Sequence, residues 1–216
     1  MRRSRHTPGA ARAGFTLIEV LAVILIIAIL SAFLVTRLTG AREAVETENT
    51  RGFIAQLAAA IEEYEGERND YPRSTFPKDL DPRPTRTNMG AEMLVISLYP
   101  ADGSWRGLEL PDDRLVNTDE DDTKRSLTRF PSAEVFEFAD DWGNPIAYLH
   151  RRDYEQAADY VTFDQKTGES VESPVMGIKN PVTGDFYNPG KFQLLSAGAD
   201  GLFGTEDDIG NFRRRD

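Results

Sequence analysis

An apolar run from Phe15 to Leu34 constrains this chain more than any other feature of its sequence. It contains a single charged residue, Glu19, and neither Gly nor Pro. The run has about 20 residues, which as a helix would measure roughly 30 Å and match the thickness of the hydrocarbon core of a bilayer. The 14 residues before it carry four Arg and no acid, and basic flanks stay on the cytoplasmic side. The pattern predicts a transmembrane helix over residues 15–35, with the N-terminus inside and the rest of the chain outside.

Two other interpretations of this segment stay open. A cleaved secretory signal would have a shorter apolar region followed by a small-residue cleavage site. Residues 28–32 do contain Ala and Ser, but the bulky Phe33, Leu34 and Val35 follow them. The segment could also be the uncleaved anchor of an unrelated periplasmic protein.

Glu19 is the anomaly within the apolar run. An ionised carboxylate in hydrocarbon is costly, so an acid at this position is a functional candidate. The simplest interpretation places Glu19 near the membrane edge, where its side chain reaches water. Cleavage before Phe15 would instead create an α-amino group at similar depth. That amine on one subunit could pair with Glu19 of a neighbour, so that both charges are compensated only in an assembly.

The segment Gly14-Phe15-Thr16-Leu17-Ile18-Glu19 resembles the processing site of type IV pilins and of the pseudopilins of type II secretion. The resemblance implies that residues 1–14 are a leader, which a prepilin peptidase removes after Gly14. It also implies that Phe15 becomes the N-methylated first residue. Glu19 then matches the acid through which subunits of this family assemble.

Composition narrows the function of the remainder. The chain has 216 residues, enough for the anchor and one globular domain. Its formal net charge is −11 and becomes −15 when the four leader Arg are removed, which disfavours nucleic-acid binding. There is no Cys, and His6 and His150 are the only two His. We find no nucleophile–base pair and no metal-ligand cluster outside an acidic C-terminal loop, so the sequence does not predict an enzyme.

The helix is expected to continue beyond the membrane. Apolar and small side chains recur every three to five residues, and acidic residues surround them. Gly66, followed by Asn69 and Pro72, predicts the end of the helix. We therefore expect residues 36–66 to continue the helix outside the membrane and residues 67–216 to form a globular domain. The predicted stripe consists of Leu38, Ala41, Val45, Thr50, Ile54, Leu57, Ile61 and Tyr64.

The globular part is predicted to combine a short helix with antiparallel strands. The helix is expected over residues 88–98, and strands over 146–150, 160–163 and 191–196. Residues 102–129, with the acidic run 119–122, are interpreted as a solvated loop, and residues 171–188 as an irregular insertion. The predicted fold class is α+β: a long N-terminal helix packed on a three- or four-stranded antiparallel sheet.

A Gly-rich acidic loop covers residues 196–211. Calcium takes six to eight oxygen ligands from carboxylates and backbone carbonyls. Asp200 lies near one end of the loop and Asp207 and Asp208 near the other, with four Gly among the 16 residues. The residue types alone are equally compatible with a calcium site and with an ordinary acidic surface loop.

Two segments add a resemblance to the major pseudopilins of type II secretion. Residues 141–145, Asp-Trp-Gly-Asn-Pro, are similar to a family segment that has Pro at the position of Asp141. Residues 196–201, Ser-Ala-Gly-Ala-Asp-Gly, are similar to the start of the family's calcium loop. The resemblance implies that Asp200, Asp207 and Asp208 supply carboxylate oxygens to Ca²⁺. It implies a backbone carbonyl from Ala197, where the family has Leu.

The sequence therefore predicts a structural subunit of a type II secretion pseudopilus. The resemblance implies polymerisation with itself or other pseudopilins, and contacts with a prepilin peptidase and an inner-membrane secretion platform. The expected location is the inner membrane, with a single pass and a periplasmic domain. Residues 73–140 and 149–189 exceed the family's core, so major and minor subunits are not distinguished. A type IV pilin for adhesion or DNA uptake, and a membrane-tethered periplasmic enzyme or binding protein, remain the alternatives.

Overall fold

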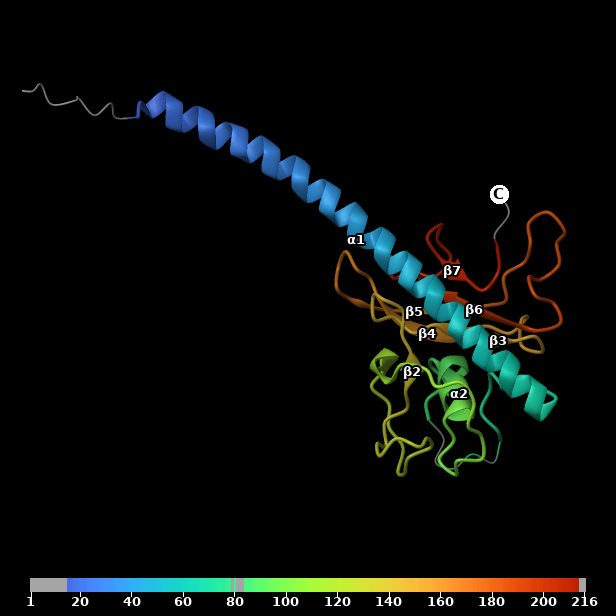
Figure 1. The fold of residues 1–216 in the computed structure, drawn as a ribbon. Helices are drawn as coiled ribbons and strands as arrows, with labels where there is room; N and C mark the ends of the chain where they lie inside the picture. The colour runs from blue at the N-terminus through green and yellow to red at the C-terminus, as the bar shows by residue number, and fades with distance from the viewer. Residues whose placement is uncertain (1–14, 79, 81–83, 214–216) are drawn as a thin grey trace, which may run out of the picture. The chain divides into compact units, whose positions relative to one another are not determined.

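A computed structural model describes residues 15–78, 80 and 84–213 of the chain, without the side chains of residues 32–39. The leader expected over residues 1–14 therefore lies outside the described residues, and so does Gly14. The chain divides into two compact units, residues 1–42 and 43–216. We describe each unit by itself (Figure 1).

The long N-terminal helix α1 spans Leu17–Arg68. Asn69 ends it in the left-handed conformation (φ 58°), with its N–H bonded to the Glu65 carbonyl at 2.7 Å. This is a common way to close a helix, because the short Asn side chain tolerates positive φ. The predicted helix is confirmed, and it ends two residues beyond the predicted Gly66.

Within the second unit, one face of α1 is buried. Ile54, Leu57 and Ile61 from the predicted stripe are at most 3% exposed, and they pack in one cluster with residues of the sheet and of α2. Figure 1 shows this cyan part of α1 running past β6 and β3. Phe53, which the stripe omitted, also belongs to the core, whereas Val45 is 59% exposed. The stripe therefore becomes a core face only in its C-terminal part.

The second helix, α2, spans Met89–Leu98 and confirms the predicted short helix. It packs against β2, β3 and β4. Gly90, in its first turn, lies so close to the Tyr148 carbonyl and the Tyr160 hydroxyl that a Cβ there would collide with both. Most of the helix is buried, including the carboxyl group of Glu92.

Seven strands form three small antiparallel sheets in the described residues. In chain order, a short 3₁₀ helix precedes them, and the elements are η1 (Asp112–Arg114), β1 (Leu115–Val116), β2 (Glu137–Phe138), β3 (Ala147–His150), β4 (Ala158–Phe163), β5 (Ser170–Val175), β6 (Phe192–Ser196) and β7 (Ile209–Gly210). β1 pairs with β2, β4 pairs with β5, and β6 lies between β3 and β7. The α+β class is confirmed, and the three-stranded β3-β6-β7 sheet packs against α1.

Two details of the predicted sheet are wrong. The strand expected at 160–163 forms, but as β4 it pairs with β5 instead of joining β3 and β6. β5 itself lies largely within residues 171–188, which were interpreted as irregular because of their Pro and Gly residues. Pro174 stands opposite Asp159 in this ladder. A two-stranded ladder has only edge strands, and an edge strand tolerates a residue without an N–H donor.

The acidic segment 102–129 also differs from the prediction. It contains η1 and β1, and its central run is not fully solvated: Asp121 is 7% exposed and Asp119 is half-buried. Asn117 ties the segment down, because its Nδ2 donates to the Asp121 carbonyl at 2.8 Å and its Oδ1 accepts from the Asp121 N–H at 3.2 Å. Asp119 and Asp121 are therefore folded inward, while Glu120 and Asp122 remain exposed.

Candidate functional site

The N-terminal motif forms a closed hydrogen-bonded structure at the start of α1. One carboxylate oxygen of Glu19, Oε2, accepts bonds from the Thr16 N–H at 2.8 Å and from the Thr16 hydroxyl at 2.7 Å. The Glu19 N–H in turn lies 3.3 Å from the Thr16 Oγ1. Thr at the helix start and Glu three residues later is a capping box, which satisfies N–H groups that a helix end leaves unpaired. Sequence reasoning missed this role, although Thr16-Leu17-Ile18-Glu19 carries its spacing.

The apolar residues that follow make no buried core within the first unit. Their large side chains are 47% to 85% exposed between Phe15 and Leu30. Among the described residues, no helix is both long and apolar enough to cross a membrane. The end of the predicted 15–35 segment, from residue 32 onward, belongs to the stretch whose side chains lie outside the described residues.

Glycine is required at two positions of the C-terminal loop. Gly198 (φ 69°) approaches the backbone and the carboxylate of Asp207, and Gly201 (φ 74°) approaches the Phe163 carbonyl. A Cβ at either position would collide with those atoms, and both residues adopt a left-handed backbone that favours Gly. The Thr162 hydroxyl also donates to the Gly201 carbonyl at 2.6 Å. The Gly-rich sequence thus folds the loop tightly against β4.

The structure brings together two of the three predicted carboxylate ligands. Asp207 Oδ2 accepts a bond from the Asp200 N–H at 2.9 Å, and the Thr205 hydroxyl contacts both side chains. Asp200 Oδ1 accepts from the Leu202 N–H at 2.8 Å. Burial acts to raise the pKa of Asp207, but hydrogen bonds from Thr205 and from backbone N–H groups outweigh it and hold the pKa below its ordinary value. Asp207 therefore favours its charged form.

Asp208 and Ala197 complete the predicted set. Both are buried, and Asp208 Oδ2 accepts a bond from the Gly204 N–H at 3.0 Å. Among the described residues, no three carboxylates of the loop have one oxygen each within 4.8 Å of one another. Carboxylate oxygens are ligands that suit Ca²⁺, but in this loop they accept hydrogen bonds from the loop's own N–H and O–H groups. A bound ion would have to replace some of these hydrogen bonds.

Asp140 joins the two segments that carry the family resemblance. Its Oδ1 accepts bonds at 3.0 Å from the N–H groups of Trp142 and Asn144, and its Oδ2 accepts from the Ser196 hydroxyl at 2.6 Å. Burial raises the pKa of Asp140 to about 6, against the effect of these hydrogen bonds. The turn over residues 141–145 is thereby fixed to the start of the C-terminal loop.

The neighbouring Asp141 fastens the same turn to α1. Asn49 Nδ2 donates to Asp141 Oδ2 at 2.8 Å, and the Asp141 N–H donates to the Thr50 hydroxyl at 3.1 Å. Arg114 forms an ion pair with the other oxygen. Asp141 thus has a structural role of its own in this chain.

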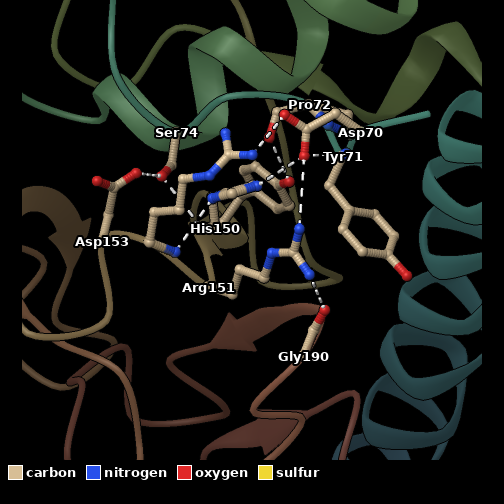
Figure 2. A network of polar contacts seen from close by, with 10 residues as sticks. Asp70, Tyr71, Pro72, Ser74, His150, Arg151, Asp153 and Gly190 are labelled. Atoms are coloured by element: carbon tan, nitrogen blue, oxygen red, sulfur yellow. Dashed lines mark hydrogen bonds and ion pairs between the residues drawn. The ribbon is translucent and has the colours of Figure 1, made fainter. Parts of the chain in front are cut away.

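His150 belongs to a polar network that connects the segment after α1 with β3 (Figure 2). Its Nδ1 accepts a bond from the Arg152 N–H at 3.1 Å, and its Nε2 lies 3.6 Å from Asp70 Oδ1. Ser74 accepts from the His150 N–H and donates to Asp153 at 2.7 Å. Burial, together with Arg152, lowers the pKa of His150. The imidazole is therefore held in a structural contact and does not face Ser74 as a base.

A further group of carboxyl residues was missed by sequence reasoning, which found no metal-ligand cluster outside the C-terminal loop. Glu92, Asp119 and Glu137 each offer one oxygen, and the three oxygens lie within 4.8 Å of one another. The residues are 18 to 45 positions apart, so no spacing motif marks them. The available signal was Glu92, the one charged residue in the otherwise apolar and small helix Met89–Leu98.

Comparisons with known proteins agree with the N-terminal motif. Residues 9–35 match the family model described as the prokaryotic N-terminal methylation motif. The chain is 28% identical over 201 residues to the type II secretion system core protein G of Escherichia coli (strain K12), which covers 92% of this chain and 90% of that protein. It is 27% identical over 205 residues to core protein G of Aeromonas hydrophila, covering 95% of both.

A third relative gives the same result. Core protein G of Pectobacterium carotovorum subsp. carotovorum is 26% identical over 204 residues, which covers 94% of this chain and 86% of that protein. No solved structure gives a significant match. The chain thus combines an α+β fold and a matched N-terminal methylation motif with similarity, along nearly its whole length, to core protein G of type II secretion systems.

Proposed function

We propose that this chain is a structural subunit of a type II secretion pseudopilus. The observation that carries the proposal is the methylation motif over residues 9–35 in a chain that is similar to core protein G over more than nine-tenths of its length. The exposed apolar side chains between Phe15 and Leu30 support it, because an unburied apolar helix needs either lipid or other subunits around it. The relatives are secretion-system components, and no catalytic role is proposed.

The proposed life of the subunit follows from the same segment. A prepilin peptidase removes residues 1–14, and the new N-terminal Phe15 is methylated. The helix anchors the subunit in the inner membrane, with its N-terminus at the cytoplasmic side and residues 67–216 in the periplasm. Copies of the chain, or other pseudopilins, then assemble on the secretion platform with Glu19 paired to a neighbour's N-terminal amine.

We propose in addition that the C-terminal loop binds Ca²⁺ through Asp200, Asp207 and Asp208, with the Ala197 carbonyl. The support is chemical: the Thr205 hydroxyl contacts the carboxylates of both Asp200 and Asp207, and Gly198 and Gly201 allow the backbone to fold closely around them. Ca²⁺ would replace hydrogen bonds that now restrain the loop and would remove the repulsion among its acids. Sites of millimolar to submillimolar affinity are sufficient outside the cytoplasm.

Deleting the gene tests the proposed role in secretion. In the source bacterium, loss of this chain is expected to stop export of the proteins that its type II system secretes, while periplasmic accumulation of those proteins rises. A plasmid copy restores export, and a copy with an altered Gly14–Phe15 junction does not. Normal export in the deletion strain, with loss of surface adhesion or DNA uptake instead, would assign the chain to a type IV pilus.

A further inference from the structure

The globular domain holds a group of acidic side chains away from both the N-terminal motif and the C-terminal loop. Glu92 lies in the first turn of α2, Glu137 on β2, and Asp119 in the segment that follows β1. One oxygen of each lies within 4.8 Å of the others. The charge of Asp121, two residues beyond Asp119, also acts on both Glu92 and Glu137. Three separate elements thus converge on one point.

The two Glu side chains of this group are buried, and several of the group's carboxyl oxygens have no hydrogen-bond partner. Glu92 and Glu137 are 0% exposed. Both carboxyl oxygens of Glu92 are buried without a hydrogen-bond partner, and so are Oδ1 of Asp119 and Oδ1 of Asp121. Buried polar groups in proteins are almost always hydrogen-bonded, so four such oxygens in one place call for a ligand.

The remaining oxygens are held by the surrounding chain. Asn88 Nδ2 donates to Glu137 Oε1 at 2.8 Å, and the Thr118 N–H donates to Glu137 Oε2 at 3.2 Å. Thr85 holds the two Asp residues: its hydroxyl donates to Asp119 Oδ2 at 2.9 Å and its N–H to Asp121 Oδ2 at 3.0 Å. Each Asp is therefore fixed by one oxygen while its other oxygen stays available. This is the arrangement that orients carboxylate ligands toward an ion.

Without a cation, this group is unfavourable. Burial, with the charges of Asp121, Glu137 and Asp119, raises the pKa of Glu92 to about 11. Burial also raises the pKa of Glu137 to about 8 and of Asp121 to about 6. Protonation removes the charge of Glu92 but does not satisfy it, because an O–H also needs an acceptor and neither oxygen has a partner. A cation would satisfy the oxygens and the charges together.

We propose that Glu92, Asp119 and Glu137 bind one Ca²⁺ ion in the interior of the domain, with Asp121 as a further carboxylate at the site. The ligands are all oxygens, which hard cations prefer, and the group contains no imidazole or thiolate. Three oxygens within 4.8 Å of one another are close enough to bind one ion at about 2.4 Å, the Ca²⁺ distance. Ca²⁺ also accepts irregular ligand geometry, whereas Mg²⁺ needs a near-ideal octahedron.

An ion can reach this site from the surface. Asp119 is half-buried, and with Thr85 and Thr118 it lines an open surface cavity. The ion would tie α2, β2 and the acidic segment to one another. The site is separate in sequence from the C-terminal loop, and its existence does not depend on the proposed role in secretion.

Calcium binding by the full-length chain in detergent tests the site. The parent protein carries Asp200→Asn, so that the C-terminal loop does not contribute. It is expected to bind one Ca²⁺ per chain in calorimetric titration and to melt at a higher temperature with Ca²⁺ than with EDTA. Adding Glu92→Gln, which keeps the side-chain size, should weaken binding by roughly tenfold or more and remove the gain in melting temperature. In EDTA the two proteins should melt alike.

Two more variants make the result decisive. Asp119→Asn, at the half-buried edge of the group, should lose Ca²⁺ binding as Glu92→Gln does. It provides the same test if the Glu92→Gln protein does not fold. Glu120→Gln changes an exposed acid of the same segment and should bind like the parent. The proposal is overturned if the Asp200→Asn protein binds no Ca²⁺, or if Glu92→Gln and Asp119→Asn both bind it as tightly as the parent.

Discussion

Glu19→Ala is expected to leave the chain in the membrane and to reduce its incorporation into filaments at least about tenfold. Insertion should not suffer, because the substitution removes a costly charge from an apolar helix. Assembly should suffer, because the methylated amine of Phe15 on each neighbouring subunit would lose its carboxylate partner in a place without water. Crosslinking in cells, read as the ladder of multimers, measures the effect.

The capping box in the structure supplies matched controls for this experiment. Glu19 accepts bonds from Thr16 in the isolated chain, so Glu19→Ala also removes a helix cap worth about 0.5–2 kcal/mol. Thr16→Ala breaks the side-chain part of that cap but keeps the carboxylate, while Glu19→Gln keeps an acceptor for the cap but removes the charge. Pairing with an amine predicts failure of Glu19→Gln and a nearly normal ladder for Thr16→Ala. The opposite pattern would reduce Glu19 to a capping residue.

The second large effect is expected at the C-terminal loop. Full-length protein carrying Glu92→Gln should no longer bind Ca²⁺ at the interior carboxyl group. In this protein, Ca²⁺ should still raise the melting temperature. Binding to the folded state alone stabilises by roughly 2.7 kcal/mol at a hundredfold excess over Kd. Asp200→Asn should abolish this gain, because it removes one of the charged ligands while keeping the Oδ1 that accepts from the Leu202 N–H. Thermal unfolding with Ca²⁺ and with EDTA measures both.

Glu206 is the control for the loop experiment. It lies beside Asp207 but is exposed, so Glu206→Gln lowers the local negative charge without removing a proposed ligand. Its Ca²⁺-dependent gain should equal that of the parent within error. If the melting temperature of the parent does not change with chelator, the loop is an acidic turn held by its own hydrogen bonds, and the ligand assignment is wrong.

The parts of the fold that sequence predicted well are those with local signals. α1 follows from continuous helical periodicity and ends near Gly66 and Asn69, and β3 and β6 follow from short apolar runs bounded by turns. β5 was missed because Pro174 and nearby Gly suggest a break. Whether a Pro interrupts a strand depends on which edge of the ladder it occupies, and that is a tertiary fact.

The acidic residues show the same limit at the level of sites. Charge alone suggested that residues 119–122 face water, but Thr85 and Asn117 hold Asp119 and Asp121 inward. Their convergence with Glu92 joins segments that are not neighbours in sequence, so no local pattern could reveal it. The N-terminal motif was predictable because its chemistry lies in six consecutive residues, although the capping contact of Thr16 was overlooked there.

The intact mass of the chain extracted from its native membranes tests the central claim most directly. Processing as a pseudopilin predicts a single species with the mass of residues 15–216 plus one methyl group, and fragmentation that places the methyl group on the α-amino nitrogen of Phe15. In a strain without prepilin peptidase, the same measurement should return the unprocessed and unmethylated chain. A persistent leader in the wild-type strain, or a mature N-terminus beyond Ala32, would contradict the account.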